Sequence, residues 1–308
     1  MQEELMNALS SIAHQYLAVN YDMVWLKTML KKGQETRKSG TLITGSSHAL
    51  NGINEKYINN CVNCSMHSQD IYYDFICAKT ILEQAGKGVF DKCFIVMGYY
   101  IPFQDLSRST VMRNMMITPV YYPVFGDAHN WETPSAFEPW RYAMDTPEEA
   151  RKICEILAEQ LILQKGTYYS DLKQRKSFFD LGGRRWCDLP QEEMEAYGKE
   201  RALSHNKMVV HEASFKENCD ILKDYVRLLQ MHNITPAVVI TPFTPAYNKY
   251  IDNRYREAIM EMLDKVEGTI HYIDFNDCDM FDETDFMDTD HLNAAGADKV
   301  SFLLNDLF

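Results

Sequence analysis

The chain has 308 residues, of which 46% are apolar, and this length allows a sizeable buried core in one large domain or two small ones. Its formal net charge of −13 argues against a nucleic-acid or anionic-membrane surface, because phosphate binding needs clustered Lys and Arg. The chain has no run of eighteen apolar residues and begins without the basic start and apolar stretch of a signal peptide, so we expect no membrane span and a cytoplasmic protein.

Apolar positions at helical spacing predict a first helix over residues 4–31. Short apolar runs predict five strands, at 41–45, 57–63, 93–98, 237–241 and 270–275. Further helices are predicted at 70–86, 215–231, 247–266 and after Asn293, whose side chain is a suitable N-cap. This alternation predicts an α/β fold of three layers, with a mostly parallel five-stranded sheet and helices on both faces.

Residues 107–214 fit the alternation less well, because they are rich in aromatic and turn-forming residues. Two stretches within them have helical patterns, at about 147–163 and 190–203. No Pro-, Ser- or Gly-rich linker sets the region apart. We therefore expect one domain over 1–308, with 107–214 as an insertion or cap over the site, and a separate domain as the alternative.

Three residue types that nucleophilic catalysis requires occur near the two ends of the chain. Ser47 follows the first predicted strand, and Asp288 and His291 follow the last one. A serine nucleophile needs a base to take its proton and a carboxylate to orient that base. Loops at the carboxyl ends of parallel strands carry the reacting groups in such sheets. We predict Ser47 as nucleophile, His291 as base and Asp288 as orienting carboxylate; the alternative for Ser47 is a plain helix N-cap.

These residues lie in segments that resemble the SGNH, or GDSL-type, hydrolase superfamily, in particular the bacterial branch with proteins of teichoic-acid D-alanylation and polysaccharide O-acetylation. Its four sequence blocks are matched by residues 45–47, 63–70, the strand ending at Gly98, and 288–296. Asn218 and the strand end at 241–245 extend the resemblance over the first and last hundred residues. It implies a flavodoxin-like fold and a serine esterase or O-acyltransferase acting on a small-molecule or glycan acyl ester.

The resemblance also implies an oxyanion hole, which the superfamily builds from a glycine N–H in the second block and an asparagine side chain in the third. Here Ser68 stands near the glycine position, and Tyr100 stands where the asparagine is expected. We expect backbone donors at Ser47 and Ser68. Either Tyr100 or Tyr99 replaces the asparagine as a donor, or the site works with two donors only. The missing asparagine leaves open a second function, a non-catalytic SGNH-like module that binds a glycan or a partner protein.

Several other residues have two readings. Arg184, Arg185 and Trp186 follow a glycine pair and could bind an anionic substrate, since guanidinium groups match carboxylate and phosphate; a solvated loop is the alternative. His48 and His67 lie beside the predicted site and are expected to be packing or rim residues.

Asp290 is expected to be solvated or to balance charge at the start of the last helix. The acidic stretch 277–290 lacks the ligand spacing of an EF-hand and is expected to be an acidic loop. The pattern Gly45-x-Ser47-x-Ala49 approaches the α/β-hydrolase elbow, but that fold places several strands before its serine. The elbow reading is therefore the weaker one.

The eight cysteines are expected to remain reduced thiols, because no export signal is present. Cys61 and Cys64 have the spacing of a redox or zinc pair, which leaves a redox or zinc protein as a third interpretation. A structural zinc site needs four ligands, and no second pair of this kind exists. We expect small apolar residues in a buried strand, with no metal and no cofactor. The sequence leaves the oligomeric state open.

Overall fold

A computed structural model of the protein describes residues 21–132 and 178–307. Contacts divide the chain into two units, Met1–Thr28 with Leu106–Gln174, and Met29–Asp105 with Arg175–Phe308. The predicted helix at 147–163 lies outside the described residues. So does most of the one predicted at 4–31, of which the described part is α2 (Tyr21–Glu35). That 107–214 forms an insertion or cap stays a prediction.

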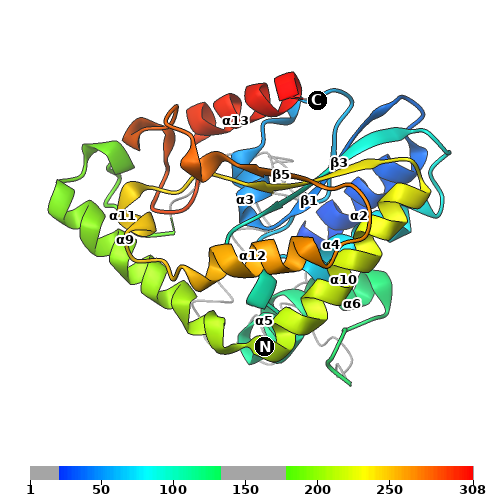
Figure 1. The fold of residues 1–308 in the computed structure, drawn as a ribbon, viewed down its shortest axis with the longest axis horizontal. Helices are drawn as coiled ribbons and strands as arrows, with labels where there is room; N and C mark the ends of the chain where they lie inside the picture. The colour runs from blue at the N-terminus through cyan, green and yellow to red at the C-terminus, as the bar shows by residue number, and fades with distance from the viewer. Residues whose placement is uncertain (1–20, 133–177, 308) are drawn as a thin grey trace, which may run out of the picture. The chain divides into compact units, whose positions relative to one another are not determined.

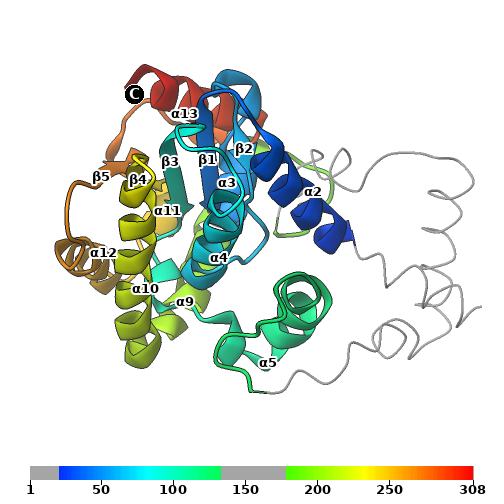
Figure 2. The same cartoon turned by 90° about the vertical axis from the view of Figure 1, so that its right-hand side faces the viewer.

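The second unit contains a five-stranded sheet in which every neighbouring pair is parallel. Its strands are β1 (Gly40–Gly45), β2 (Val62–Asn63), β3 (Phe90–Met97), β4 (Thr235–Ile240) and β5 (His271–Asp274). They lie side by side in the order β2-β1-β3-β4-β5 (Figure 2). This is the flavodoxin-like order, whose direction reverses between β1 and β3. The prediction of an α/β fold with a parallel five-stranded sheet is confirmed.

Helices cover both faces of this sheet, as alternate residues of the strands show. On one face, Phe94 of β3 packs in the core cluster that includes Val300 and Leu304 of α13 (Ala294–Leu307). On the other, Cys93 lies 3.4 Å from the hydroxyl of Tyr225 of α10 (Glu212–Met231). Figure 1 shows α13 on one side of the strands and α10 with α12 (Arg254–Asp264) on the other. The three layers follow from this alternation.

Local sequence signals explain where several helices begin. The Asp70 side chain accepts the Tyr73 N–H and starts α4 (Ile71–Leu82). Asn293 accepts the N–H groups of Ala295 and Gly296 and starts α13, as predicted. None of the helices that the structure describes is long and apolar enough to cross a bilayer.

Two predicted elements differ from the structure. The strand predicted at 57–63 is reduced to β2, because a 3-10 turn at Glu55–Tyr57 (η1) and a left-handed Asn60, φ 42°, interrupt it. The helix predicted at 247–266 is two helices, α11 (Pro245–Asn248) and α12. Asp252 separates them: its N–H is bound by the side chain of Asn206, and its own carboxylate accepts the Arg254 N–H.

The described part of the first unit after residue 105 is a run of short helices. They are η3 (Leu106–Arg108), α5 (Thr110–Met112), the π-helix η4 (Arg113–Tyr121) and α6 (Tyr122–Phe125). The run ends at Gly126, whose left-handed φ of 66° is typical of a helix C-terminus. Arg113 of this run donates to the Ser107 carbonyl and lies over the ring of Trp131, which follows the run in sequence.

Candidate active site

Ser47 is presented by the turn that joins β1 to α3 (Ser47–Gly52). Gly45 makes this turn possible: its φ is +145°, and a Cβ there would lie 2.0 Å from the Val96 carbonyl oxygen. Ser46 caps the helix by accepting the N–H of His48. Ser47 is therefore the first residue of a helix at the carboxyl end of β1, next to the point where the strand order reverses.

His291 and Asp288 lie in a tight turn between β5 and α13. Oδ1 of Asp288 accepts the N–H groups of Asp290, at 3.1 Å, and His291, at 2.9 Å. The N–H of Met287 binds the His291 carbonyl oxygen at 2.9 Å. These bonds fix the loop backbone, so the offset of three residues brings the carboxylate against the ring of its own turn.

The structure brings the three predicted residues together. Oγ of Ser47 is 2.8 Å from Nε2 of His291, although 244 positions separate them in sequence. Nδ1 of the same ring is 3.1 Å from Oδ1 and 3.2 Å from Oδ2 of Asp288. The hydroxyl, the imidazole and the carboxylate thus form one hydrogen-bonded chain, which is the geometry that proton transfer from a serine requires.

Burial and neighbouring charges have opposite effects on the pKa values of His291 and Asp288. Burial alone would lower the pKa of His291, but the carboxylates of Asp288 and Asp290 raise it above its usual value. Burial alone would raise the pKa of Asp288, but the His291 charge and hydrogen bonds lower it to about 2. One of those bonds, 2.7 Å long, comes from the backbone N–H of Phe178 to Oδ2. Asp288 is therefore a carboxylate that favours the imidazolium form of His291.

His48 lies against His291 instead of at a solvated rim. The two rings are stacked, with centroids 5.2 Å apart and an angle of 20° between planes. Nε2 of His48 is 3.2 Å from the Tyr100 hydroxyl and Nδ1 is 3.3 Å from Oγ1 of Thr241. Burial and the neighbouring His291 lower the pKa of His48 to about 3. It is a neutral packing residue, which is one of the two roles expected for it.

Asp290 is fully buried, which corrects the prediction of a solvated carboxylate. Both of its oxygens lie 3.0 Å from Nε of Arg201, on α9 (Gln191–Asn206). A buried carboxylate is stable only with such a partner. The sequence analysis did not identify Arg201. Arg201 lies four residues before the buried His205, on the same face of α9, but the sequence carries no signal for its pairing with Asp290.

Three residues, Ser47, Ser68 and Tyr100, were predicted to donate hydrogen bonds to the oxyanion. Ser47 begins α3, and the first N–H groups of a helix have no acceptor within it. Ser68 has a left-handed φ of 57°, and its carbonyl accepts Nε2 of Gln104 at 2.6 Å, which orients that peptide. The Tyr100 hydroxyl is bound to His48. The roles of all three in an oxyanion hole stay predictions.

The segment predicted to bind substrate has partners of its own. Arg184 makes a two-bond ion pair with Glu193, and Arg185 makes one with Asp188. Trp186 is 1% exposed in the core cluster and donates its indole N–H to Glu283. No interaction that the structure gives for these three residues links them to Ser47 or His291. Substrate binding by this segment stays a prediction.

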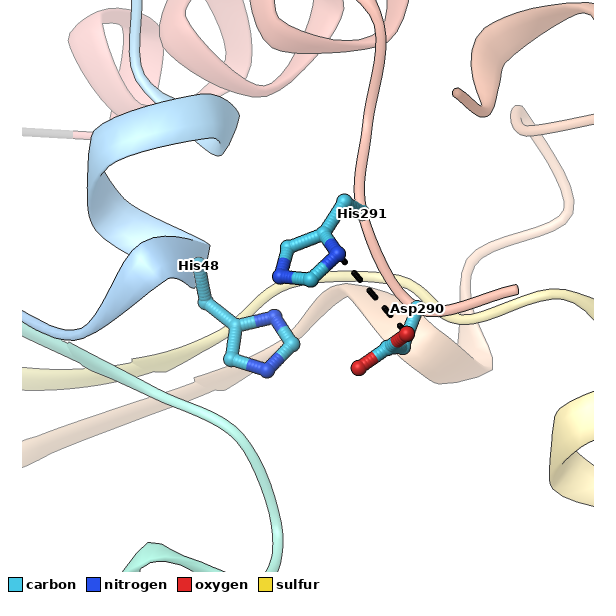
Figure 3. A group of neighbouring side chains, drawn as sticks. All are labelled: His48, Asp290 and His291. Carbon is cyan, nitrogen blue, oxygen red and sulfur yellow. Dashed lines mark ion pairs between the residues drawn. The ribbon is translucent and has the colours of Figure 1, made fainter. Parts of the chain in front are cut away.

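The triad residue His291 forms a group with the buried side chains of His48 and Asp290 (Figure 3). The possible metal-ligand atoms of these three residues lie within 4.8 Å of one another. Such a group could hold a metal ion. Each atom already has another partner, however: Arg201 binds Asp290, and the two rings bind hydroxyl groups or carboxylates. A cation would have to displace these bonds and lie beside a guanidinium. We interpret the group as part of a hydrogen-bonded network.

Cys61 and Cys64 are buried free thiols beside β2. Burial raises the pKa of both thiols, which disfavours the thiolate that metal binding and disulfide exchange require. Both cysteines are buried, as small apolar side chains would be at these positions.

Comparisons with known proteins add little. No protein-family model matches the chain, and no curated protein sequence matches it. Among solved structures, one similar chain is described as a candidate platelet activating factor from Streptococcus pneumonia. The overlap covers 100% of this chain and 98% of that one, with a TM-score of 0.43 and 11% identity. An overlap at this level supports no statement about function.

Proposed function

We propose that the protein is a serine-dependent ester hydrolase or O-acyltransferase that uses Ser47, His291 and Asp288. The observation that carries this proposal is the 2.8 Å contact between Oγ of Ser47 and Nε2 of His291, with Asp288 on the other ring nitrogen. The expected substrate is a small-molecule or glycan acyl ester, as in the bacterial SGNH branch that the sequence resembles.

The reaction has two halves. His291 takes the Ser47 proton while Oγ attacks the ester carbonyl carbon, and Asp288 holds the ring and stabilises the imidazolium that forms. Backbone N–H groups of Ser47 and Ser68 are proposed to bind the oxyanion. The tetrahedral intermediate expels the alcohol, which takes the proton from His291 and leaves an acyl group on Ser47. Water or an acceptor hydroxyl then repeats the steps in reverse and releases the acyl group.

A fluorophosphonate probe tests the nucleophile, because it reacts with an activated serine without needing the natural substrate. We expect one probe per chain, mapped by peptide mass spectrometry to Ser47. The Ser47→Ala variant is expected to lose the label, and Ser204→Ala is expected to keep it, because Ser204 is an exposed serine of α9. A folded wild-type protein that takes no label at Ser47 would count against the enzyme and favour a non-catalytic binding module.

A further inference from the structure

Two carboxylates compete for one side of the His291 ring. Nδ1 is 3.1 Å from Oδ1 of Asp288 and 3.7 Å from Oδ1 of Asp290. Figure 3 marks the ion pair between His291 and Asp290. Both carboxylates are fully buried. A neutral imidazole with a proton on Nδ1 has a single N–H there, so only one of them can orient the ring by a full hydrogen bond. The proposed mechanism gives that bond to Asp288.

Arg201 occupies the competing carboxylate. Its Nε lies 3.0 Å from each oxygen of Asp290, and its side chain is only 13% exposed. The guanidinium carbon lies 3.9 Å from the centroid of the Phe178 ring, so the face of this ring makes a cation–π contact with Arg201. Phe178 is also the residue whose backbone N–H binds Asp288. The two carboxylates thus have separate partners within one buried cluster.

We propose that Arg201 is a positioning residue of this site: by binding Asp290 and balancing its charge, it leaves Asp288 as the only carboxylate that orients His291. This inference rests on the proposed function, because it assigns Arg201 a part in the proton transfer from Ser47. It predicts that Arg201 and Asp290 act on His291 as a pair whose two charges oppose each other.

The groups that face His291 come from four parts of the chain. Its own turn supplies Asp288 and Asp290, and α9 supplies Arg201. The remaining three are histidines, and burial keeps the pKa of each low: His48 of α3, His67 before α4 and His205 of α9. The pKa of His48 is lowered to about 3 and that of His67 to about 4, so they are neutral near pH 7. Two carboxylates and one guanidinium therefore set the charge around His291.

The expected pH behaviour follows from the sign of each charge. His291 acts as a base only when neutral, and its pKa is raised above 6.5, so the wild-type labelling rate should rise with pH to a midpoint above 6.5. Arg201→Met removes a cation and should move this midpoint upward. Asp290→Asn removes an anion and should move it downward. Each shift is expected to be about one pH unit, and the double variant should return close to the wild type.

Two measurements on the full-length protein test the proposal. The first is the titration of the His291 ring by NMR in histidine-labelled protein, with the signal assigned from a His291→Gln variant. The second is the rate of fluorophosphonate labelling as a function of pH. Lys223→Met is the matched control, because it removes a cation from an exposed ion pair with Glu267. It should leave both titrations unchanged.

Opposite shifts in the single variants and recovery in the double variant support the proposal. Shifts in the same direction, an unmoved midpoint, or a double variant as impaired as Arg201→Met would overturn it. If Arg201→Met does not fold, Asp290→Asn decides alone: a lower midpoint supports the proposal, and an unchanged or higher one contradicts it. Absent labelling of the wild type, with a normal NMR titration of His291, would instead identify a failure of the proposed function.

Discussion

Replacing His291 with alanine is expected to lower kcat/KM for an activated ester such as p-nitrophenyl acetate by up to about 10⁶-fold, to the background rate. The imidazole is the only base within hydrogen-bonding distance of Oγ of Ser47 among the described residues, at 2.8 Å. Without it the serine proton has no acceptor, and the hydroxyl is a weak nucleophile at neutral pH. Initial rates of p-nitrophenol release measure the effect.

The matched control for this variant is His211→Ala. His211 is exposed just before α10, and its side chain makes no capping bond there. We expect the His211→Ala control to hydrolyse the ester at the wild-type rate. Both variants should unfold at the same temperature as the wild type. A His291→Ala variant that is folded and still hydrolyses the ester within tenfold of the wild type would remove His291 from the mechanism.

The second large effect is expected for Asp288→Asn, with a loss in kcat of about 10⁴-fold. An amide nitrogen facing Nδ1 would favour the wrong tautomer of His291, with its proton on the nitrogen that faces Ser47. The change also removes the main charge that raises the pKa of His291, so the remaining activity should have its acidic midpoint at a lower pH. Rates measured from pH 5 to 9 give both quantities.

Asp290→Asn is the natural comparison, because it neutralises the neighbouring buried carboxylate. Oδ1 of Asp290 is 3.7 Å from Nδ1, whereas Oδ1 of Asp288 is 3.1 Å away. We therefore expect a much smaller loss of activity than in Asp288→Asn. Equal losses in the two variants, or a larger loss in Asp290→Asn, would show that the orienting carboxylate was assigned to the wrong residue.

The sheet could be predicted because its strands are short apolar runs bounded by turn residues. The runs at 93–98 and 237–241 are buried on both faces, which leaves little ambiguity about their type. The strand predicted at 57–63 was too long, because the left-handed Asn60 interrupts it and only Val62 and Asn63 pair with β1. Turns of this kind depend on backbone angles that an apolar pattern does not encode.

Part of the site could also be predicted from the sequence. Ser47 follows the end of β1, and Asp288 and His291 lie in the connection between β5 and α13, so the topology of a parallel sheet brings them to one edge. Arg201 and the burial of Asp290 could not be found in this way, because an ion pair between α9 and a loop 89 residues further on exists only once the chain has folded. From sequence alone an aspartate is expected to be exposed to solvent, because it is rarely buried without a positively charged partner.

The predicted role of Arg184 and Arg185 in substrate binding shows another limit of prediction from sequence. Gly182 and Gly183 both have left-handed φ angles, so they form a turn, as their residue type suggests. Arg185 then pairs with Asp188, three residues along the same segment. The sequence shows these opposite charges three residues apart, but only the structure shows that they pair. This pairing gives the guanidinium a structural partner without any substrate.

The central claim is that Ser47 becomes acylated. Rapid mixing with p-nitrophenyl acetate followed by an acid quench would trap the intermediate, since a protonated His291 cannot assist its hydrolysis. Peptide mass spectrometry should then find one acetyl group per chain on Ser47, and no acetylation in the His291→Ala variant. Acetyl groups only on lysines, or an equal yield on Ser47 in both proteins, would contradict the account.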